Sequence, residues 1–135
     1  MYQIGEVSKQ LYVSSDTLRY YEKIKLLPAI SRLDSGLRAY SNKDLSRIKF
    51  IKRAQRMKFS LNEIALLLNF REQPQTAKPE IRKLANARLK DIEEHLAELE
   101  TLRKEFTLLI GLCQESDEGC PILESFEDSI ILNND

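Results

Sequence analysis

Two cysteines near the C-terminus are the residues of this chain best suited to chemistry. Cys113 and Cys120 enclose six residues, 114–119, which are polar or glycine and predict a loop. Thiolate sulfur binds soft and borderline metal ions such as Cu(I), Ag(I), Zn(II) and Cd(II), and it binds Ni(II) when other ligands complete the site. A pair of thiols can equally be inert or redox-active. The pair therefore predicts either a metal site or a redox centre.

A second set of candidate residues lies near the N-terminus and is suited to binding nucleic acid. Residues 15–22 read Ser-Asp-Thr-Leu-Arg-Tyr-Tyr-Glu, in which Arg19 is placed to meet a phosphate or a guanine edge in a major groove. Each adjacent tyrosine offers a ring and a hydroxyl suited to bracing a sugar-phosphate backbone, and one of the two is expected in the core. Arg38 and Tyr40, on the predicted wing, are expected to contact the sugar-phosphate backbone of the DNA beside that groove. The predicted DNA-contacting residues are Ser15, Thr17, Arg19, Tyr20, Tyr21, Lys23, Arg38 and Tyr40.

The charge of the chain is divided unevenly although its formal sum is zero. Residues 1–58 hold 13 Lys and Arg against 5 Asp and Glu, a net charge of +8, and residues 59–135 hold 8 against 16, a net charge of −8. This asymmetry indicates that the N-terminal half meets a polyanion. Several cations in that half are expected to form a general electrostatic surface rather than specific contacts: Lys49, Lys52, Arg53, Arg56 and Lys58.

The elements that position these residues are predicted to be mainly helical. Two short helices in succession predict a helix-turn-helix, and Asp34-Ser35-Gly36 is a turn signal that predicts a small β-wing. Ser60 followed three residues later by Glu63 has the capping-box pattern of a helix start. The expected elements are helices Ile4–Lys9, Asp16–Lys25, Ser41–Lys58 and Ser60–Phe70, with the wing inside Ser31–Tyr40.

A long helix is predicted over Pro79–Leu112, because no glycine or further proline interrupts the chain before Gly111. At about 33 residues it would be roughly 50 Å long, too long for the preceding short helices to cover. A second copy of the same helix is the simplest partner for its apolar stripe, and a helix folded back on its own domain is the alternative. The stripe consists of Ile81, Ala85, Ile92, Leu99, Leu102, Phe106 and Leu109.

The location of the protein is expected to be cytoplasmic. No apolar run approaches the roughly 18 residues that cross a membrane. The N-terminal residues lack the charged-then-apolar layout of a signal peptide. In a reducing cytoplasm Cys113 and Cys120 are expected to be thiols rather than a structural disulfide.

The motifs taken together resemble those of the MerR family of bacterial transcriptional regulators. The resemblance rests on Arg-Tyr-Tyr-Glu at 19–22, Gly-Leu-Arg-Ala-Tyr at 36–40, Phe-Ser-Leu at 59–61, the long helix and the cysteine-bounded loop. It implies a mainly α fold: a winged helix-turn-helix, an antiparallel coiled-coil dimerisation helix and a C-terminal metal-binding loop. The implied boundaries are 1–72 for the DNA-binding domain, 73–78 for a linker, 79–112 for the dimerisation helix and 113–135 for the effector segment.

The resemblance also implies a function and partners. A homodimer would bind double-stranded promoter DNA, and an effector ion held by Cys113 and Cys120 would make it bend and underwind that DNA so that RNA polymerase engages both promoter elements. Such a protein would control a metal-homeostasis promoter and would not be an enzyme.

The identity of the ion stays open at this level. The resemblance implies a third cysteine, from the start of the partner's long helix, in relatives that sense Zn(II), Cd(II) or Hg(II), and Lys78 aligns at or near that place. A protonated lysine offers no lone pair, so Zn(II) ranks behind the other ions. Two thiolates with a monovalent ion carry −1, which Lys78 would offset, and this favours Cu(I) or Ag(I). The chain also resembles nickel-responsive members of the family, so Ni(II) with added nitrogen or oxygen ligands stays open. The only histidine, His95, would lie roughly 27 Å along the helix from Cys113 and is expected to pack near the dyad.

Three other functions are possible from the residues. A thiol-based sensor of oxidants or electrophiles would use the same two cysteines. An enzyme with a cysteine nucleophile is poorly supported, because the single histidine is remote from both thiols. A coiled-coil scaffold or RNA-binding module would not need the wing or the Arg19 helix.

Overall fold

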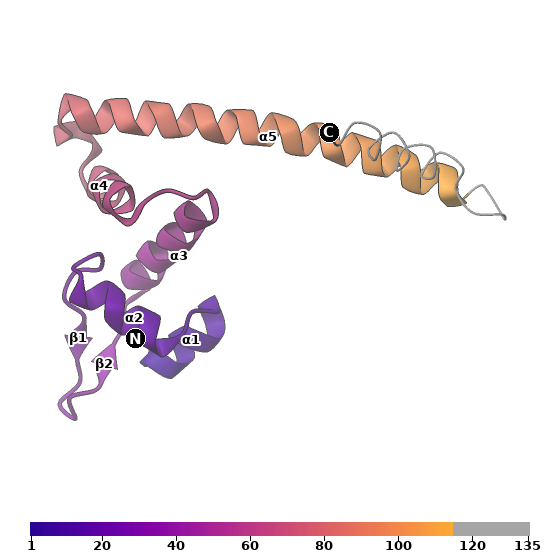
Figure 1. Cartoon of the computed structure of the whole chain (residues 1–135). Helices are drawn as coiled ribbons and strands as arrows, with labels where there is room; N and C mark the ends of the chain where they lie inside the picture. The colour runs from indigo at the N-terminus through magenta and orange to yellow at the C-terminus, as the bar shows by residue number, and fades with distance from the viewer. Residues whose placement is uncertain (115–135) are drawn as a thin grey trace, which may run out of the picture. The chain divides into compact units, whose positions relative to one another are not determined.

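The computed structural model of the protein describes residues 1–114 (Figure 1), and Cys120 lies outside them. Five α-helices, a two-stranded hairpin and a short 3-10 helix follow one another along this part of the chain. The chain divides into two compact units, the first from Met1 to Ala87 and the second from Arg88 onward. The expectation of a mainly α fold is confirmed.

Helices α1 (Ile4–Leu11) and α2 (Ser15–Lys23) form the helix-turn-helix. The N-cap of α2 is Ser14, whose side chain accepts a hydrogen bond from the Thr17 amide at 3.1 Å. Such a cap satisfies a backbone donor that has no partner within the helix. The predicted second helix ended at Lys25, whereas α2 ends at Lys23, and Lys25 adopts the left-handed conformation with φ of 61°.

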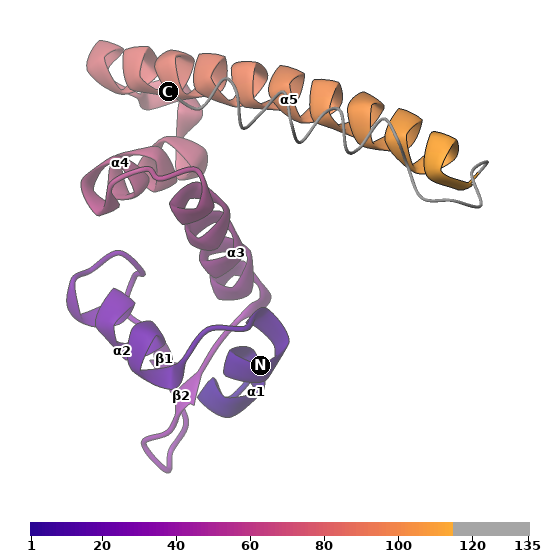
Figure 2. The same ribbon diagram turned by 45° about the vertical axis from the view of Figure 1, so that its right-hand side comes forward.

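The wing is the antiparallel hairpin of β1 (Ser31–Arg32) and β2 (Arg38–Ala39), with Ser31 paired to Ala39 and Arg32 to Arg38. Gly36 in its turn has a φ of +86°, a conformation that costs a residue with a side chain more than it costs glycine. Within the first unit, the hairpin lies beside α1 and α2 and extends away from α4 (Figures 1 and 2). The predicted wing is confirmed.

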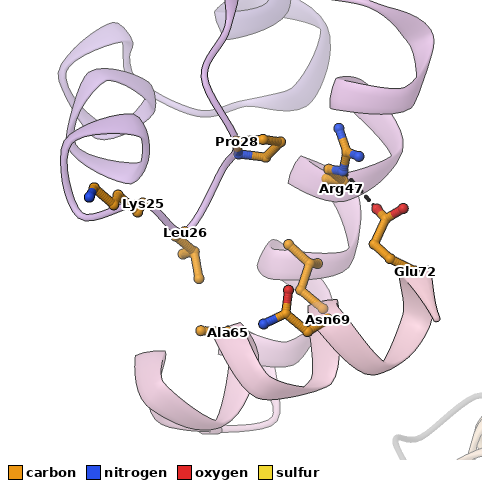
Figure 3. Close-up of a pocket in the computed structure, with 8 residues that line it drawn as sticks. Lys25, Leu26, Pro28, Arg47, Ala65, Asn69 and Glu72 are labelled. Atoms are coloured by element: carbon orange, nitrogen blue, oxygen red, sulfur yellow. Dashed lines mark hydrogen bonds and ion pairs between the residues drawn. The ribbon is translucent and has the colours of Figure 1, made fainter. Parts of the chain in front are cut away.

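Helices α3 (Asn42–Arg56) and α4 (Leu61–Glu72) pack together and complete the first unit. Ser41 and Asp44 form a capping box at the start of α3. The Arg47 guanidinium on α3 donates to the Glu72 carboxylate at the end of α4 over 2.8 Å, at the edge of a hollow of about 290 Å³ (Figure 3). This hydrogen bond lowers the pKa of the Glu72 carboxyl. The ion pair therefore holds the last turn of α4 against α3.

The core of the first unit gathers apolar side chains from all four short helices and the segment around the wing. Val7, Leu18, Ile48 and Ile64, one from each helix, have no exposed surface. Tyr40, directly after β2, is also fully buried. Its backbone forms two hydrogen bonds with that of Tyr2: the Tyr2 amide donates to the Tyr40 carbonyl over 2.8 Å, and the Tyr40 amide donates to the Tyr2 carbonyl over 2.7 Å. One core thus holds the wing and the helix-turn-helix together.

The predicted linker contains a 3-10 helix, Pro74–Thr76, and α5 follows as a single helix over Pro79–Gln114. The first unit continues to Ala87, so it takes in the linker and the first turns of α5. Ile81 and Leu84 on those turns are half-buried. Throughout residues 1–114, no helix combines the length and apolar character needed to cross a membrane.

The buried hydroxyl of Tyr40 yields a test of the core. Within residues 1–114 this oxygen has no hydrogen-bond partner, and an unpaired buried hydroxyl costs about 1–3 kcal/mol. We expect Tyr40→Phe to raise the free energy of unfolding by about 1 kcal/mol, measured by urea denaturation. Leu18→Ala, which removes a fully buried side chain, should lower it by about 2–5 kcal/mol. A loss of stability in Tyr40→Phe would show that the hydroxyl has a partner in solution.

Candidate DNA-binding surface and sensor end

The exposed face of α2 carries three of the predicted DNA-contacting residues. Arg19, Tyr20 and Lys23 are all exposed on this helix. Arg19 Nη1 lies 3.1 Å from the carboxylate of Asp16, which is 97% exposed. Such a surface ion pair contributes about 0–1 kcal/mol, so a phosphate could replace the carboxylate at little cost. Arg19 is therefore available to an anion.

The hydroxyls at the start of α2 are arranged around its cap. The Ser14 and Thr17 side-chain oxygens lie 2.7 Å apart, and Ser15 and Thr17 are half-buried. Both hydroxyls lie in the first turn, where backbone amides without helical partners and the helix dipole favour an anion. Ser15 and Thr17 remain candidates for a phosphate contact.

Tyr21 lies in the core rather than on the surface. Its side chain is 4% exposed, and its hydroxyl donates to Gln55 Oε1 on α3 over 2.8 Å. Burial raises the pKa of the phenol, and the hydrogen bond to Gln55 opposes that shift. The expectation that one of the two adjacent tyrosines is buried is confirmed, and the prediction of a DNA contact is wrong for Tyr21 in the free protein.

Tyr40 departs further from its prediction. Its side chain is fully buried, and burial is the main cause of the raised pKa of its phenol. A phosphate cannot reach this hydroxyl without displacing the core around it. The expectation that Tyr40 grips the DNA backbone is therefore wrong for the free protein, and its place in the motif reflects packing.

Arg38 connects the wing to α2. Its Nε donates to Glu22 Oε2 over 2.7 Å, and both side chains are mostly buried, with exposed fractions of 23% and 19%. A charge-assisted hydrogen bond in this environment restrains the angle between the hairpin and α2. The sequence does not indicate this pairing, because the partners lie 16 residues apart.

Arg32 is an exposed arginine on β1 that was not among the predicted DNA-contacting residues. It pairs with Arg38 across the hairpin, and its Nη1 donates to the Gly36 carbonyl over 2.9 Å. The available signal was the position of an arginine within the predicted wing, because arginine side chains commonly contact phosphate oxygens.

The basic face of α3 and its following turn includes one residue with a structural role. Lys49, Arg53, Arg56 and Lys58 are exposed, as a general electrostatic surface requires. Lys52 differs, since its ammonium group donates to the Leu11 carbonyl at the end of α1 and to the Tyr12 carbonyl.

The sensor end begins at the last turn of α5, where Cys113 is half-buried. An apolar hollow of about 430 Å³ there is lined by Phe106, Leu109, Ile110, Cys113 and Gln114. Cys113 is disulfide-bonded in the structure, which differs from the expected thiol. Among residues 1–114 no three His, Cys, Asp or Glu side chains come together as a metal site. A complete site would therefore need ligands from beyond residue 114 or from another chain.

The second unit exposes large apolar side chains along α5. Eight of them are roughly one-third to two-thirds exposed in the single chain, which is unusual for a solvated helix. His95 lies on the same stretch and is exposed. The eight are Leu89, Ile92, Leu96, Leu99, Leu102, Phe106, Leu108 and Ile110.

Models of known protein families match both the helix-turn-helix and the long helix. Residues 2–70 match the MerR HTH family regulatory protein model, and residues 45–109 match the MerR, DNA binding model. The HTH-type transcriptional regulator ZntR of Escherichia coli K12 is 37% identical over 131 residues, which cover 94% of this chain and 93% of that protein. Heavy metal-dependent transcription regulator 2 of Rhizobium meliloti is 32% identical over 122 residues, covering 90% and 83%.

A solved structure agrees. The transcription regulator PbrR691 from Ralstonia metallidurans CH34, crystallised in complex with lead(II), is 32% identical, with a TM-score of 0.57 over 93% of this chain and 99% of that one. The two family models together span α2, the wing and most of α5. The chain is a DNA-binding transcriptional regulator of the MerR family.

Proposed function

We propose that this regulator acts as a homodimer, that it binds a metal ion through Cys113 and Cys120, and that the bound ion changes the shape of promoter DNA so that RNA polymerase can use it. The observation that carries the proposal is the position of Cys113, half-buried beside an apolar hollow at the end of α5. A thiolate shielded by apolar side chains suits a soft ion, because water competes poorly there. The relatives named for heavy metals and crystallised with lead(II) support an effector of this class.

The homodimer is proposed because α5 leaves its apolar side chains without a cover in the single chain. An antiparallel pair of α5 helices would remove them from water. Such a pair would also bring the end of one α5 toward the start of the other, where Lys78 is exposed beside Ile81. Lys78 would then offset the negative charge of a bis-thiolate holding Cu(I) or Ag(I). Ni(II) would require nitrogen or oxygen ligands in addition.

On DNA, the proposed contacts are Arg19, Tyr20 and Lys23, with Ser15 and Thr17 on phosphates. Arg38 would orient the wing through Glu22 and meet the flanking backbone with its remaining donors. In a dimer the two α2 helices would read two half-sites, and a change in their separation would appear as bending or twisting of the DNA between them.

A redox sensor is the second candidate, because the same two cysteines could be oxidised to a disulfide. In that mechanism a peroxide would accept two electrons and two protons from two thiols and leave a disulfide. Induction by peroxide in a metal-depleted medium would favour this function, and induction by one ion under reducing conditions would favour the metal sensor.

The first prediction concerns Arg19. We expect Arg19→Ala to weaken binding to an operator selected from a random duplex library by about 1–3 kcal/mol, or roughly 5- to 150-fold, because a charged contact is lost. Fluorescence anisotropy over a salt series should show a slope reduced by about one if the contact is a phosphate. Asp16→Ala is the matched control, since it removes only the ion-pair partner and should not weaken binding. Equal affinities of Arg19→Ala and the wild type would remove α2 from the interface.

The second prediction concerns assembly. Leu99→Asp should dissociate or unfold the dimer, because a charge would be buried without a partner. Sedimentation velocity at micromolar concentration, together with circular dichroism, measures both outcomes. Glu98→Asp, one position away on the exposed surface of α5, should remain dimeric. A folded wild-type monomer at that concentration would contradict the proposed pairing.

The third prediction concerns the sensor. Cys113→Ser and Cys120→Ser should each abolish metal-dependent transcription from the operator while leaving operator binding intact. Direct titration of reduced dimer with Cu(I), Ag(I), Ni(II) and Zn(II) should show binding that tightens as pH rises, because each thiol must lose its proton. Lys78→Cys should shift the preference toward Zn(II) or Cd(II) by adding a sulfur. Thr107→Ser on the same helix is the control. An unchanged response in both cysteine variants would place the ligands elsewhere.

A further inference from the structure

Tyr12, at the turn of the helix-turn-helix, adopts a backbone conformation that suits glycine better. It is the C-cap of α1, with φ of 55° and ψ of 47°, and its amide donates to the Ser8 carbonyl. In this left-handed region the Cβ atom of an L-residue crowds the following carbonyl, whereas glycine has no Cβ. A glycine at position 12 would therefore make a more stable turn.

Packing does not explain the choice of tyrosine. The side chain is 89% exposed, so the ring buries little apolar surface. Within residues 1–114 its hydroxyl makes no hydrogen bond, and its ring contact is the Lys52 ammonium, 5.8 Å from the ring centroid. An exposed cation–π contact of this kind is weak. The contacts of the Tyr12 side chain therefore do not offset the backbone strain at this residue.

Lys52 is held beside the ring. Its Nζ donates to the carbonyl oxygens of Leu11 and Tyr12, at the negative end of the α1 dipole. An ammonium group has three donors, so these two contacts leave one hydrogen available. The positive charge of Lys52 is therefore held next to the phenol of Tyr12.

The position of this pair in the fold points to a polyanion. Tyr12 precedes by two residues the α2 N-cap, Ser14, and α2 carries the exposed Arg19. In helix-turn-helix proteins the second helix enters the major groove by its N-terminal residues while the first crosses the backbone, so the turn between them passes close to phosphates. A tyrosine hydroxyl and an ammonium group are both common phosphate donors.

We propose that Tyr12 and Lys52 form a phosphate-binding contact at the turn, separate from the contacts of α2 and the wing. The hydroxyl of Tyr12 and the remaining donor of Lys52 would meet one backbone phosphate. The left-handed backbone at residue 12 lowers stability and in return presents the phenol to the DNA. The proposal rests on the DNA-binding function of the family.

Two substitutions of Tyr12 distinguish its effect on stability from its effect on DNA binding. In the full-length dimer, Tyr12→Gly should raise the melting temperature by about 2–5 °C, because the strain is relieved, yet weaken DNA binding about 5-fold. Tyr12→Phe keeps the ring and the strain, so it should melt with the wild type and also bind about 5-fold more weakly. Binding is measured by anisotropy on an arbitrary duplex at low salt, where phosphate contacts dominate. Tyr2→Phe, on the half-buried Tyr2, controls for loss of a hydroxyl elsewhere.

Each outcome decides the proposal. A higher melting temperature for Tyr12→Gly with weaker binding by both variants supports it. Wild-type affinity in either variant, or a lower melting temperature in Tyr12→Gly, overturns it. If the wild type and Arg19→Ala bind the duplex equally, the failure lies instead in the placement of α2 at the DNA.

Discussion

The packing of α3 against the helix-turn-helix is the interaction on which the DNA-binding unit depends. Ile48 and Ile51 on α3 are fully buried in the same cluster as Val7 of α1 and Leu18 of α2. None of these helices is long enough to be stable alone in water, so each exists because the others cover its apolar face. The direction in which α2 presents Arg19 follows from this shared core.

Polar contacts refine what the core establishes. Lys52 holds the end of α1, Gln55 holds Tyr21 of α2, and Arg38 holds the wing to Glu22. Each contact joins elements far apart in the sequence. It restrains the angle between those elements, which apolar packing alone restrains only weakly. Arg19, whose partner Asp16 is itself exposed, is available to DNA. In the proposed complex Arg38 and Lys52 would serve the fold and also contact the DNA through their remaining donors.

The long helix follows a different constraint. This helix of 36 residues leaves large apolar side chains exposed along the second unit of the single chain. Its uncovered side chains and the cysteine in its last turn lie on one continuous element. An ion bound at that end would therefore be connected to the proposed dimer interface through rigid helical backbone, and this is the physical basis of the proposed switch.

The order and type of the elements could be predicted from the sequence, because capping residues, turn glycines and apolar periodicity act over a few neighbouring residues. Helix boundaries agreed to within about two residues, and left-handed Lys25 lies just beyond the point where the second helix ends. The sequence also predicted that one of the two tyrosines in Arg-Tyr-Tyr-Glu is buried, because adjacent residues of a helix point to different faces. The tertiary structure alone decided which of the two adjacent tyrosines is buried and that Tyr40 is buried as well. Tyr40 and Tyr21 are polar-tipped residues in a basic segment, and only the meeting of β2, α2 and α3 places them in the core. The pairings of Arg38 with Glu22 and of Lys52 with the end of α1 span 16 and 41 residues. Local sequence carries no information on such contacts, because they exist only after the chain has folded around its common core.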